Sequence, residues 1–325
     1  MIFRTEVSPE KGLEGLLSHG TPVVLVGSCF TDNIGACMRD DLFDVIVNPF
    51  GPIYNPSSVR RAVSSIVDGI SISPGDLFPH EGRFHSHLFH SRYSGCDREA
   101  AAQAMTRQIH LAREALLHAS SLIVTLGTTR VFRHRQQGMV VANCHRLPSS
   151  SFREETLSLD QCTDDLESLV SMVRTVNPDI HIIFTVSPLR YLGQGAHINS
   201  ISKATLLLAI DSVVRTFPST HYFPSFEIMM DDLRDYRFYA DDLAHPAPQA
   251  VEYIWEKFTA AALDDEARHL LPEIEALVTA AHHRSRNPHS EAHREFCRKC
   301  LARIAALPAN IDFTEEKRDF EHYAD

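Results

Sequence analysis

The chain has 325 residues, of which 44% are hydrophobic and 22% charged, and its net charge at pH 7 is −11. A chain of this length can bury a large core, as one domain or as one domain with an extension. The negative net charge argues against a protein that binds nucleic acid through bulk electrostatics.

The amino terminus and the cysteines indicate the compartment. Residues 1–6 contain no apolar leader segment, and no apolar run approaches the ~18 residues of a membrane span. The seven cysteines are odd in number and scattered, which in a chain without a leader indicates reduced thiols. We therefore expect a cytoplasmic protein that does not contact a membrane.

Short apolar segments alternate with helical patterns from residue 22 onward. The first segment, 22–26, is rich in β-branched residues, as strands buried on both faces are. The predicted elements are strands at 22–26, 44–47, 121–126, 180–186 and 221–223, helices at 31–40, 57–67, 97–119, 158–176 and 200–217, and a hairpin over 131–141. Five strands that alternate with helices predict an α/β fold with a parallel sheet and right-handed crossovers.

The last part of the chain has a different character. Beyond about residue 262 the sequence is helical in pattern and rich in charge. We therefore predict a domain over 1–262 and a helical C-terminal extension over 263–325. The extension is expected to pack on the domain or on a partner subunit, which would make the protein a homo-oligomer.

The end of the first strand carries the nucleophile candidates. Gly27 allows a tight turn, and Ser28 and Cys29 follow it, between a strand's carboxyl end and a helix's amino end. Ligands of open α/β sheets bind at that edge, and a helix amino end stabilises a thiolate or an oxyanion. The alternative is an ordinary turn with a half-buried structural cysteine.

A candidate base lies near the end of the α/β region. Asp242 and His245 are three residues apart in a predicted loop. At that spacing a carboxylate reaches the imidazole Nδ1 and fixes its tautomer, so that Nε2 is free to accept a proton from a nucleophile. Together with the turn at residue 28, this pair indicates nucleophilic catalysis.

Two groups of residues invite a metal interpretation that we do not favour. His85, His87 and His90 lie in an irregular segment that we expect to line the site, and a metal there would need further ligands. On a helix, His289 and Cys300 would stand ~16 Å apart, too far to share one ion with the intervening His293 and Cys297. We therefore expect no metal and no cofactor, and a core position for both cysteines.

The chain resembles the GSCFA family, which is similar to the SGNH (GDSL-like) hydrolases. The resemblance rests on the stretches Gly27-Ser28-Cys29-Phe30, Asn48-Pro49-Phe50-Gly51, Thr125-Leu126-Gly127-Thr128, Ala142-Asn143-Cys144-His145, Val186-Ser187-Pro188-Leu189-Arg190, Ser202-Lys203 and the run from Tyr222 to Pro246. It implies a three-layer α/β/α flavodoxin-like fold and the transfer or hydrolysis of acyl groups. The substrate would be a small-molecule or carrier-bound acyl ester or thioester.

The resemblance also implies roles at the turn and at two glycines. The superfamily's nucleophile stands two residues after the glycine, which here is Cys29, with Ser28 as the close alternative. The oxyanion would be bound by the amide of Cys29, by Gly51 after the second strand, and by the block that begins at Gly127. Thr129 occupies the position where that block carries Asn, and its hydroxyl can donate in place of the amide.

Four further residues are candidates with alternatives. Asn143 and His145 could supply the missing oxyanion donor, and Asn143 is alternatively a turn residue. His145 could also replace His245 as the base, although no acid lies within four residues of it. Arg190 and Lys203 could hold an anionic substrate group, and Lys203 could equally be a solvated surface residue. The first functional hypothesis is an acyl-transfer enzyme, and the second is a binding module with an inert nucleophile.

Overall fold

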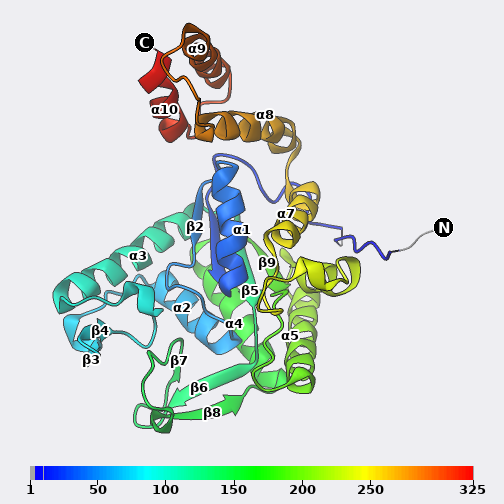
Figure 1. Ribbon diagram of the computed structural model, residues 1–325. Coiled ribbons are helices and arrows are strands. Elements are labelled where there is room, and N and C mark those ends of the chain that lie inside the picture. The colour runs from blue at the N-terminus through cyan, green and yellow to red at the C-terminus, as the bar shows by residue number, and fades with distance from the viewer. Residues whose placement is uncertain (1–3, 10, 325) are drawn as a thin grey trace.

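The structure, a computed structural model, describes residues 4–9 and 11–324. Its centre is a parallel sheet with the strand order β10-β9-β5-β1-β2 (Figure 1). The strands are β1 (Val23–Gly27), β2 (Val45–Val47), β5 (Ser121–Leu126), β9 (His181–Val186) and β10 (Thr220–Phe223). Counted along the chain, this is the flavodoxin-like order 2-1-3-4-5. The predicted five-stranded parallel sheet is therefore confirmed.

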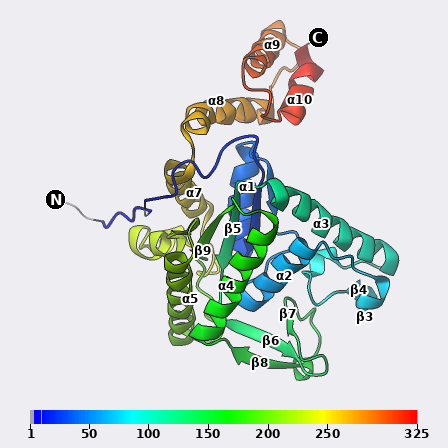
Figure 2. The ribbon, with the colours of Figure 1, turned by 180° about the vertical axis from the view of Figure 1, so that it is seen from behind.

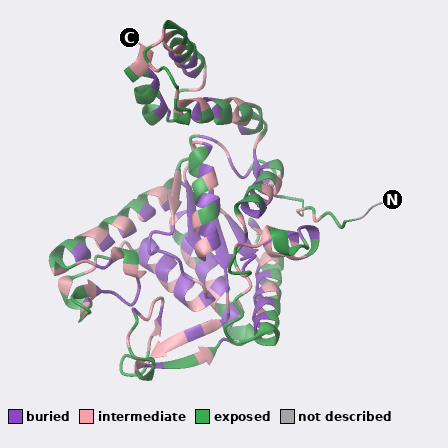
Figure 3. Cartoon of the chain, in the orientation of Figure 1, coloured by how far each residue is buried: buried purple, intermediate pink, exposed green. Residues whose placement is uncertain are grey.

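Helices cover both faces of this sheet and complete three layers. They are α1 (Cys29–Asp40), α2 (Pro56–Asp68), α3 (Arg98–His118), α4 (Leu159–Val176), α5 (Ala196–Thr216) and α7 (Pro248–Ala262). Side chains alternate along β1, so Val24 and Val26 pack with α2 to α5, whereas Val23 and Leu25 pack with α1 and α7. Figure 3 shows the buried residues concentrated in the sheet and on the helix faces toward it. The α/β/α prediction is confirmed.

Side-chain caps fix where several helices begin. Ser28, Asn55, Asp97 and Ser158 each accept a hydrogen bond from the first turn of the helix that follows. Because Ser28 is the cap, α1 begins two residues before the predicted start at 31, and Cys29 is its first residue. Helix α5 likewise begins at Ala196 instead of 200.

Two antiparallel insertions extend from the sheet at its carboxyl edge (Figures 1 and 2). The first is the hairpin of β3 (Phe78–His80) and β4 (Arg83–His85), within the segment predicted to be irregular. The second is a three-stranded sheet of β6 (Arg130–His134), β7 (Val140–Val141) and β8 (Phe152–Thr156). The hairpin predicted over 131–141 is present as β6 and β7, and β8 was not predicted. Short helical turns lie at Pro74–Asp76, Ser91–Tyr93, Ser149–Ser151, Ser225–Glu227 (α6), Ile228–Asp232 and Tyr236–Phe238.

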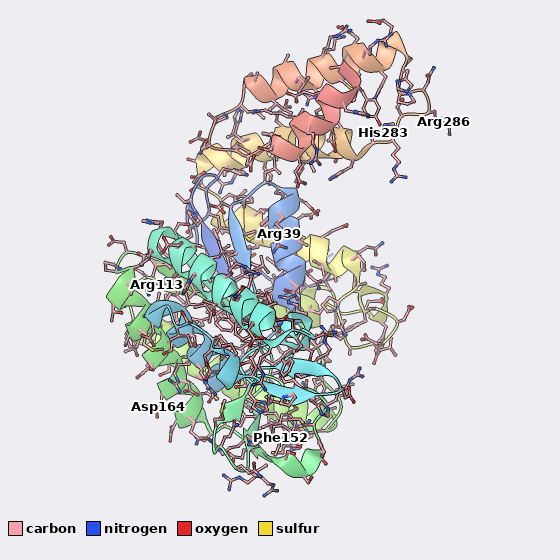
Figure 4. The ribbon with its side chains drawn as sticks, turned by 90° about the vertical axis from the view of Figure 1, so that its left-hand side faces the viewer. Arg39, Arg113, Phe152, Asp164, His283 and Arg286 are labelled. Atoms are coloured by element: carbon pink, nitrogen blue, oxygen red, sulfur yellow. The ribbon has the colours of Figure 1, made fainter. Side chains whose placement is uncertain are left out.

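The C-terminal helices form a separate layer with its own core. They are α8 (Asp265–His282), α9 (Glu291–Ala305) and α10 (Thr314–Ala324), and Figure 4 shows His283 and Arg286, between α8 and α9, at the opposite end of the molecule from Phe152. The helical extension is confirmed. Cys297 and Cys300 are buried in its core. Within residues 4–9 and 11–324, no cluster of three or more His, Cys, Asp or Glu side chains is arranged to hold a metal, and no helix has the length and apolar character of a membrane span.

Candidate active site

The turn between β1 and α1 lies at the carboxyl edge of the sheet, and its geometry is set by Gly27. A Cβ atom at this position would stand 2.3 Å from the backbone oxygen of Thr125 on β5. Only glycine allows β1 and β5 to approach so closely here. The turn then places Ser28 as the cap of α1 and Cys29 as its first residue.

Ser28 and Cys29 differ in accessibility. Ser28 is fully buried, and its hydroxyl accepts a hydrogen bond from the amide of Phe30 (3.3 Å) and donates one to Oγ of Ser187 (3.0 Å). Cys29 is half-buried. Since a nucleophile must reach its substrate, Cys29 is the more accessible of the two candidates in this conformation.

Asn48 clamps the turn from the neighbouring strand, a role that the sequence does not reveal. Its buried side chain accepts from the amide of Gly27 (2.8 Å) and donates to the carbonyl of Ser28 (3.3 Å) and to Asp32 (2.8 Å). The residue follows β2 with a positive φ of 44°, which asparagine tolerates better than most side chains. In the sequence, Asn followed by Pro after a strand indicates only a turn.

The electrostatic environment of Cys29 differs from the prediction. Burial raises the pKa of the Cys29 thiol and the Asp32 carboxylate raises it further, whereas the amides of Phe30 and Cys29 and the Lys203 ammonium lower it. The sequence predicts that the helix amino end stabilises a thiolate here, but desolvation outweighs the amides. The thiol therefore needs help to ionise at neutral pH.

Lys203 lies beneath the turn and not at the surface. It is 1% exposed, and its Nζ donates to the backbone oxygen of Ser187 (2.8 Å). Burial lowers the pKa of Lys203 to about 7, Cys29 raises it, and Arg190 lowers it. The alternative in which Lys203 is a solvated surface residue is wrong, because its side chain is buried.

The predicted pair of Asp242 and His245 is formed. Nδ1 of His245 lies 2.5 Å from Oδ2 of Asp242, and Oδ1 of Asp242 accepts from the amides of Ala244 and His245 (both 2.9 Å). These backbone hydrogen bonds, followed by the bond to the ring, lower the pKa of Asp242 to about 2. The carboxylate therefore stays ionised and can orient the imidazole.

The loop that carries this pair lies over the end of β9. The amide of Arg190 donates to the backbone oxygen of Ala244 (3.2 Å), and Arg190 follows Ser187 by three residues. The His245 side chain is 47% exposed, and no hydrogen bond within the described chain joins it to Ser28 or Cys29. In apo structures such contacts are often long and tighten only with substrate.

The predicted oxyanion donors are engaged elsewhere in this conformation. The amide of Gly51 donates to the backbone oxygen of Asn48 (2.7 Å), and the amide of Gly127 donates to that of Tyr54 (2.8 Å). The hydroxyl of buried Thr129 donates to Oγ of Ser202 (3.1 Å). The amide of Cys29, at the first position of α1, is the one predicted donor that lies at the turn itself.

The histidines of the irregular segment form a small core with the hairpin. His85 and His145 have ring nitrogens 3.1 Å apart, and both pack near Phe78 together with His87. Nε2 of His145 lies 2.8 Å from the oxygen of Ser86, and its amide donates to Oδ1 of Asn143 (2.7 Å). This arrangement gives Asn143 and His145 structural partners, and among the described residues no hydrogen bond joins either of them to the β1–α1 turn.

His90 lies beside Gly51, apart from the cluster of His85, His87 and His145. It caps the short helix Ser91–Tyr93, and its Cβ occupies the space beside Gly51, where an added Cβ would be 2.2 Å away. Burial and then the neighbouring Arg92 lower the pKa of His90. Of the three histidines expected to line the site, His90 packs against Gly51, and His87 Nδ1 lies 3.5 Å from the backbone oxygen of Asn143.

We expect the buried histidines to make the protein less stable in acid. Burial lowers the pKa of both His87 and His145 to about 4, against a backbone hydrogen bond to each ring that raises it and together with neighbouring histidines that lower it. In the unfolded chain these rings take up protons near pH 6.5, whereas in the folded chain they stay neutral until about pH 4. Protonation therefore favours the unfolded chain, and the free energy of unfolding falls as the pH drops from 6.5 toward 4. Calorimetry should show a melting temperature that falls over this range, and a smaller fall in His145→Asn. An equal slope in both proteins would contradict the assignment, and His110→Ala, at an exposed site on α3, serves as the control.

Comparisons with known proteins agree with this architecture. The fold is that of a three-layer α/β/α protein with Ser28 and Cys29 at the carboxyl edge of its sheet. The chain belongs to the GSCFA family: the model of this family matches residues 22–258, and that of the C-terminal domain of GSCFA domain proteins matches residues 274–324. No curated protein matches the chain significantly.

Two solved structures show a remote likeness. One is a carbohydrate esterase family 2 enzyme with a carbohydrate-binding domain from Corynascus thermopiles (Myceliophthora fergusii), with 13% identity, a TM-score of 0.38, and coverage of 80% of this chain and 68% of that one. The other is an acetyl xylan esterase from the rumen bacterium Butyrivibrio proteoclasticus, with 10% identity, a TM-score of 0.35, and coverage of 79% and 65%. The chain thus spans about two thirds of the length of each.

Proposed function

We propose that this protein transfers or hydrolyses acyl groups through a covalent acyl-enzyme intermediate on Cys29. The observation that carries the proposal is the position of Cys29, a half-buried thiol at the amino end of α1 and at the carboxyl edge of the sheet. Ser28, the alternative nucleophile, is buried, and its hydroxyl is hydrogen-bonded to the amide of Phe30 and to the hydroxyl of Ser187. The acyl donor would be an ester or a thioester, as a small molecule or on a carrier.

The chemistry follows from the groups at this edge. The Cys29 thiolate attacks the acyl carbonyl, and the backbone amide of Cys29 donates to the oxyanion that develops. His245, held by Asp242, accepts the thiol proton and returns it to the leaving group. Water or a second acceptor, activated by the same imidazole, then releases the acyl group. This chemistry requires neither a metal nor an organic cofactor.

The proposed mechanism requires the loop that carries His245 to move when a substrate binds. Its ring is exposed and makes no hydrogen bond to the turn in the described residues, so the loop must bring Nε2 within reach when a substrate binds. The loop is joined to the segment after β9 by the backbone hydrogen bond of 3.2 Å between Arg190 and Ala244, and its base is held by the bridge between Tyr239 and Pro246. Movement of His245 would therefore have to take place above this bridge.

A second candidate function is a binding module for an acylated or anionic ligand. The raised pKa of Cys29 and the engagement of the Gly51 and Gly127 amides favour it, because both describe a turn that is not prepared for attack. In such a module Arg190, at the same edge, would contact the anionic group of the ligand.

Replacement of His245 separates the two functions. In the proposed enzyme, His245→Ala should lower the turnover of p-nitrophenyl acetate and of acyl thioesters by a factor of about 10² or more, because proton transfer loses its base. His110→Ala, at an exposed position on α3, should retain full turnover. Circular dichroism checks that both variants are folded. A wild-type protein that is inactive on esters and thioesters alike would favour the binding module, and full turnover in His245→Ala would remove His245 from the mechanism.

A further inference from the structure

The most unusual group in the molecule is the amine of Lys203. It projects from α5 and is 1% exposed, and the hydrogen bond that the described chain gives it is to the oxygen of Ser187, just after β9. No carboxylate lies within ion-pair distance of it in the described chain, and the ring of Phe226 lies 5.5 Å away. A buried ammonium without an anion is costly, so a hydrophobic residue of similar size would be the more stable choice for the core.

Cys29, the candidate nucleophile, is the group whose charge favours a protonated Lys203. Ser187 connects the two: its backbone oxygen accepts from Lys203, and its hydroxyl accepts from Ser28, the neighbour of Cys29 in the chain. The influence is mutual, since Lys203 lowers the pKa of Cys29 and Cys29 raises that of Lys203. A thiolate at Cys29 would therefore supply the anion that Lys203 lacks.

We propose that Lys203 is the buried counter-charge of the Cys29 thiolate, a positioning residue that acts on the reaction through Cys29. When the thiol loses its proton to the base or to solvent, the ammonium of Lys203 balances the new negative charge from beneath the turn. The inference rests on the proposed use of Cys29 as a nucleophile. It adds a buried cation as the feature that makes the thiol reactive.

Other charged groups lie near Cys29 and Lys203 and affect the pKa values of both. Asp32, on the same helix as Cys29, opposes ionisation of the thiol, and the Tyr54 hydroxyl lies close enough for Cys29 and Asp32 to raise its pKa, after burial, to about 12. Arg190 opposes a charge on Lys203 from the loop after β9. Lys203 is therefore the one group facing Cys29 whose side-chain charge favours the thiolate in the described chain.

The test measures the alkylation of Cys29 by iodoacetamide as a function of pH, with peptide mass mapping and no substrate. In Lys203→Met, which removes the charge and shortens the side chain by one atom, the midpoint for Cys29 should move up by at least about one pH unit, with labelling about tenfold slower at pH 7.5. Lys257→Met removes a cation that pairs with Glu6 and should leave the profile unchanged. Exposed Cys96 is the internal reference in every sample. An unshifted midpoint in a folded Lys203→Met protein would overturn the proposal.

A second measurement does not depend on the stability of Lys203→Met. The chain has five lysines, so the ε-carbon signals of ¹³C-labelled lysine can be assigned and titrated by NMR. Coupled groups influence each other reciprocally, so Lys203 should lose its proton at a higher pH in the wild type than in Cys29→Ala. Equal midpoints would overturn the proposal. Neither experiment uses turnover, so a protein without esterase activity can still confirm the couple, and an active esterase can still lack it.

Discussion

Replacement of Gly27 by alanine should prevent the domain from folding normally. The new Cβ would stand 2.3 Å from the oxygen and 2.8 Å from the amide nitrogen of Thr125, and both are backbone atoms in the middle of a parallel sheet. Neither can move without separating β1 from β5, which pair from Val23 to Gly27. The clash should lower the free energy of unfolding by more than about 3 kcal/mol, beyond the usual cost of overpacking.

Urea denaturation of the soluble fraction measures this loss. Gly75→Ala is the matched control, because a Cβ there would meet only the Ser73 hydroxyl at an ordinary 3.5 Å. The control should stay within about 0.5 kcal/mol of the wild type. A Gly27→Ala protein with near wild-type stability would show that β1 and β5 do not approach as closely as the structure indicates.

Replacement of Cys29 by alanine should have the largest effect on activity. Loss of the nucleophile removes the covalent route altogether, so turnover of esters and thioesters should fall by a factor on the order of 10⁴ or more. Stability should change little, since the side chain is only half-buried and fills no part of the main core. Steady-state kinetics and a melting curve on the same preparation separate the two effects.

Ser28→Ala is the informative partner of this variant. It removes the cap of α1 and the hydrogen bond to Ser187, so a stability loss of about 1 kcal/mol is expected while most of the turnover remains. The opposite pattern, with an active Cys29→Ala and an inactive Ser28→Ala, would transfer the nucleophile's role to the serine. It would also require the buried hydroxyl to become accessible when substrate binds.

The fold is predictable wherever burial dominates the sequence pattern. Strands β1, β5 and β9 are continuous apolar runs because helices cover both of their faces, and that pattern is local. Strand β8 escapes prediction for the converse reason. Its residues 152–156 are mostly exposed and charged, and they are held by pairing with β6 instead of by a buried face.

The site is predictable only where its contacts are local in the sequence. The Asp242–His245 bond follows from a spacing of three residues, whereas the bond from Ser28 to Ser187 joins residues 159 positions apart. No pattern in either segment specifies that pairing, because it depends on how the strands are ordered in the sheet. The hydrogen bonds of Asn48 to the β1–α1 turn and of the Gly51 amide to Asn48 could not be predicted for the same reason, because they also depend on the tertiary structure.

The burial of Lys203 has a signal in the sequence, the periodicity of its helix. Lys203 precedes Leu206, Ile210 and Val213 by three, seven and ten residues, which is the repeat of one helix face, and all four side chains are buried. A lysine that falls in register with such an apolar stripe is a candidate for a buried amine. The residue type, considered without that periodicity, points to the surface.

The most direct test of the central claim is a search for the covalent intermediate. The protein is incubated with a series of acyl thioesters and p-nitrophenyl esters, quenched in acid, and analysed by intact mass and peptide mapping. The account predicts an increase equal to one acyl group, located on Cys29, present in His245→Ala and absent in Cys29→Ala. Turnover with no acyl group on Cys29 in any quenched sample, or an acyl group located at a residue away from the β1–α1 turn, would contradict it.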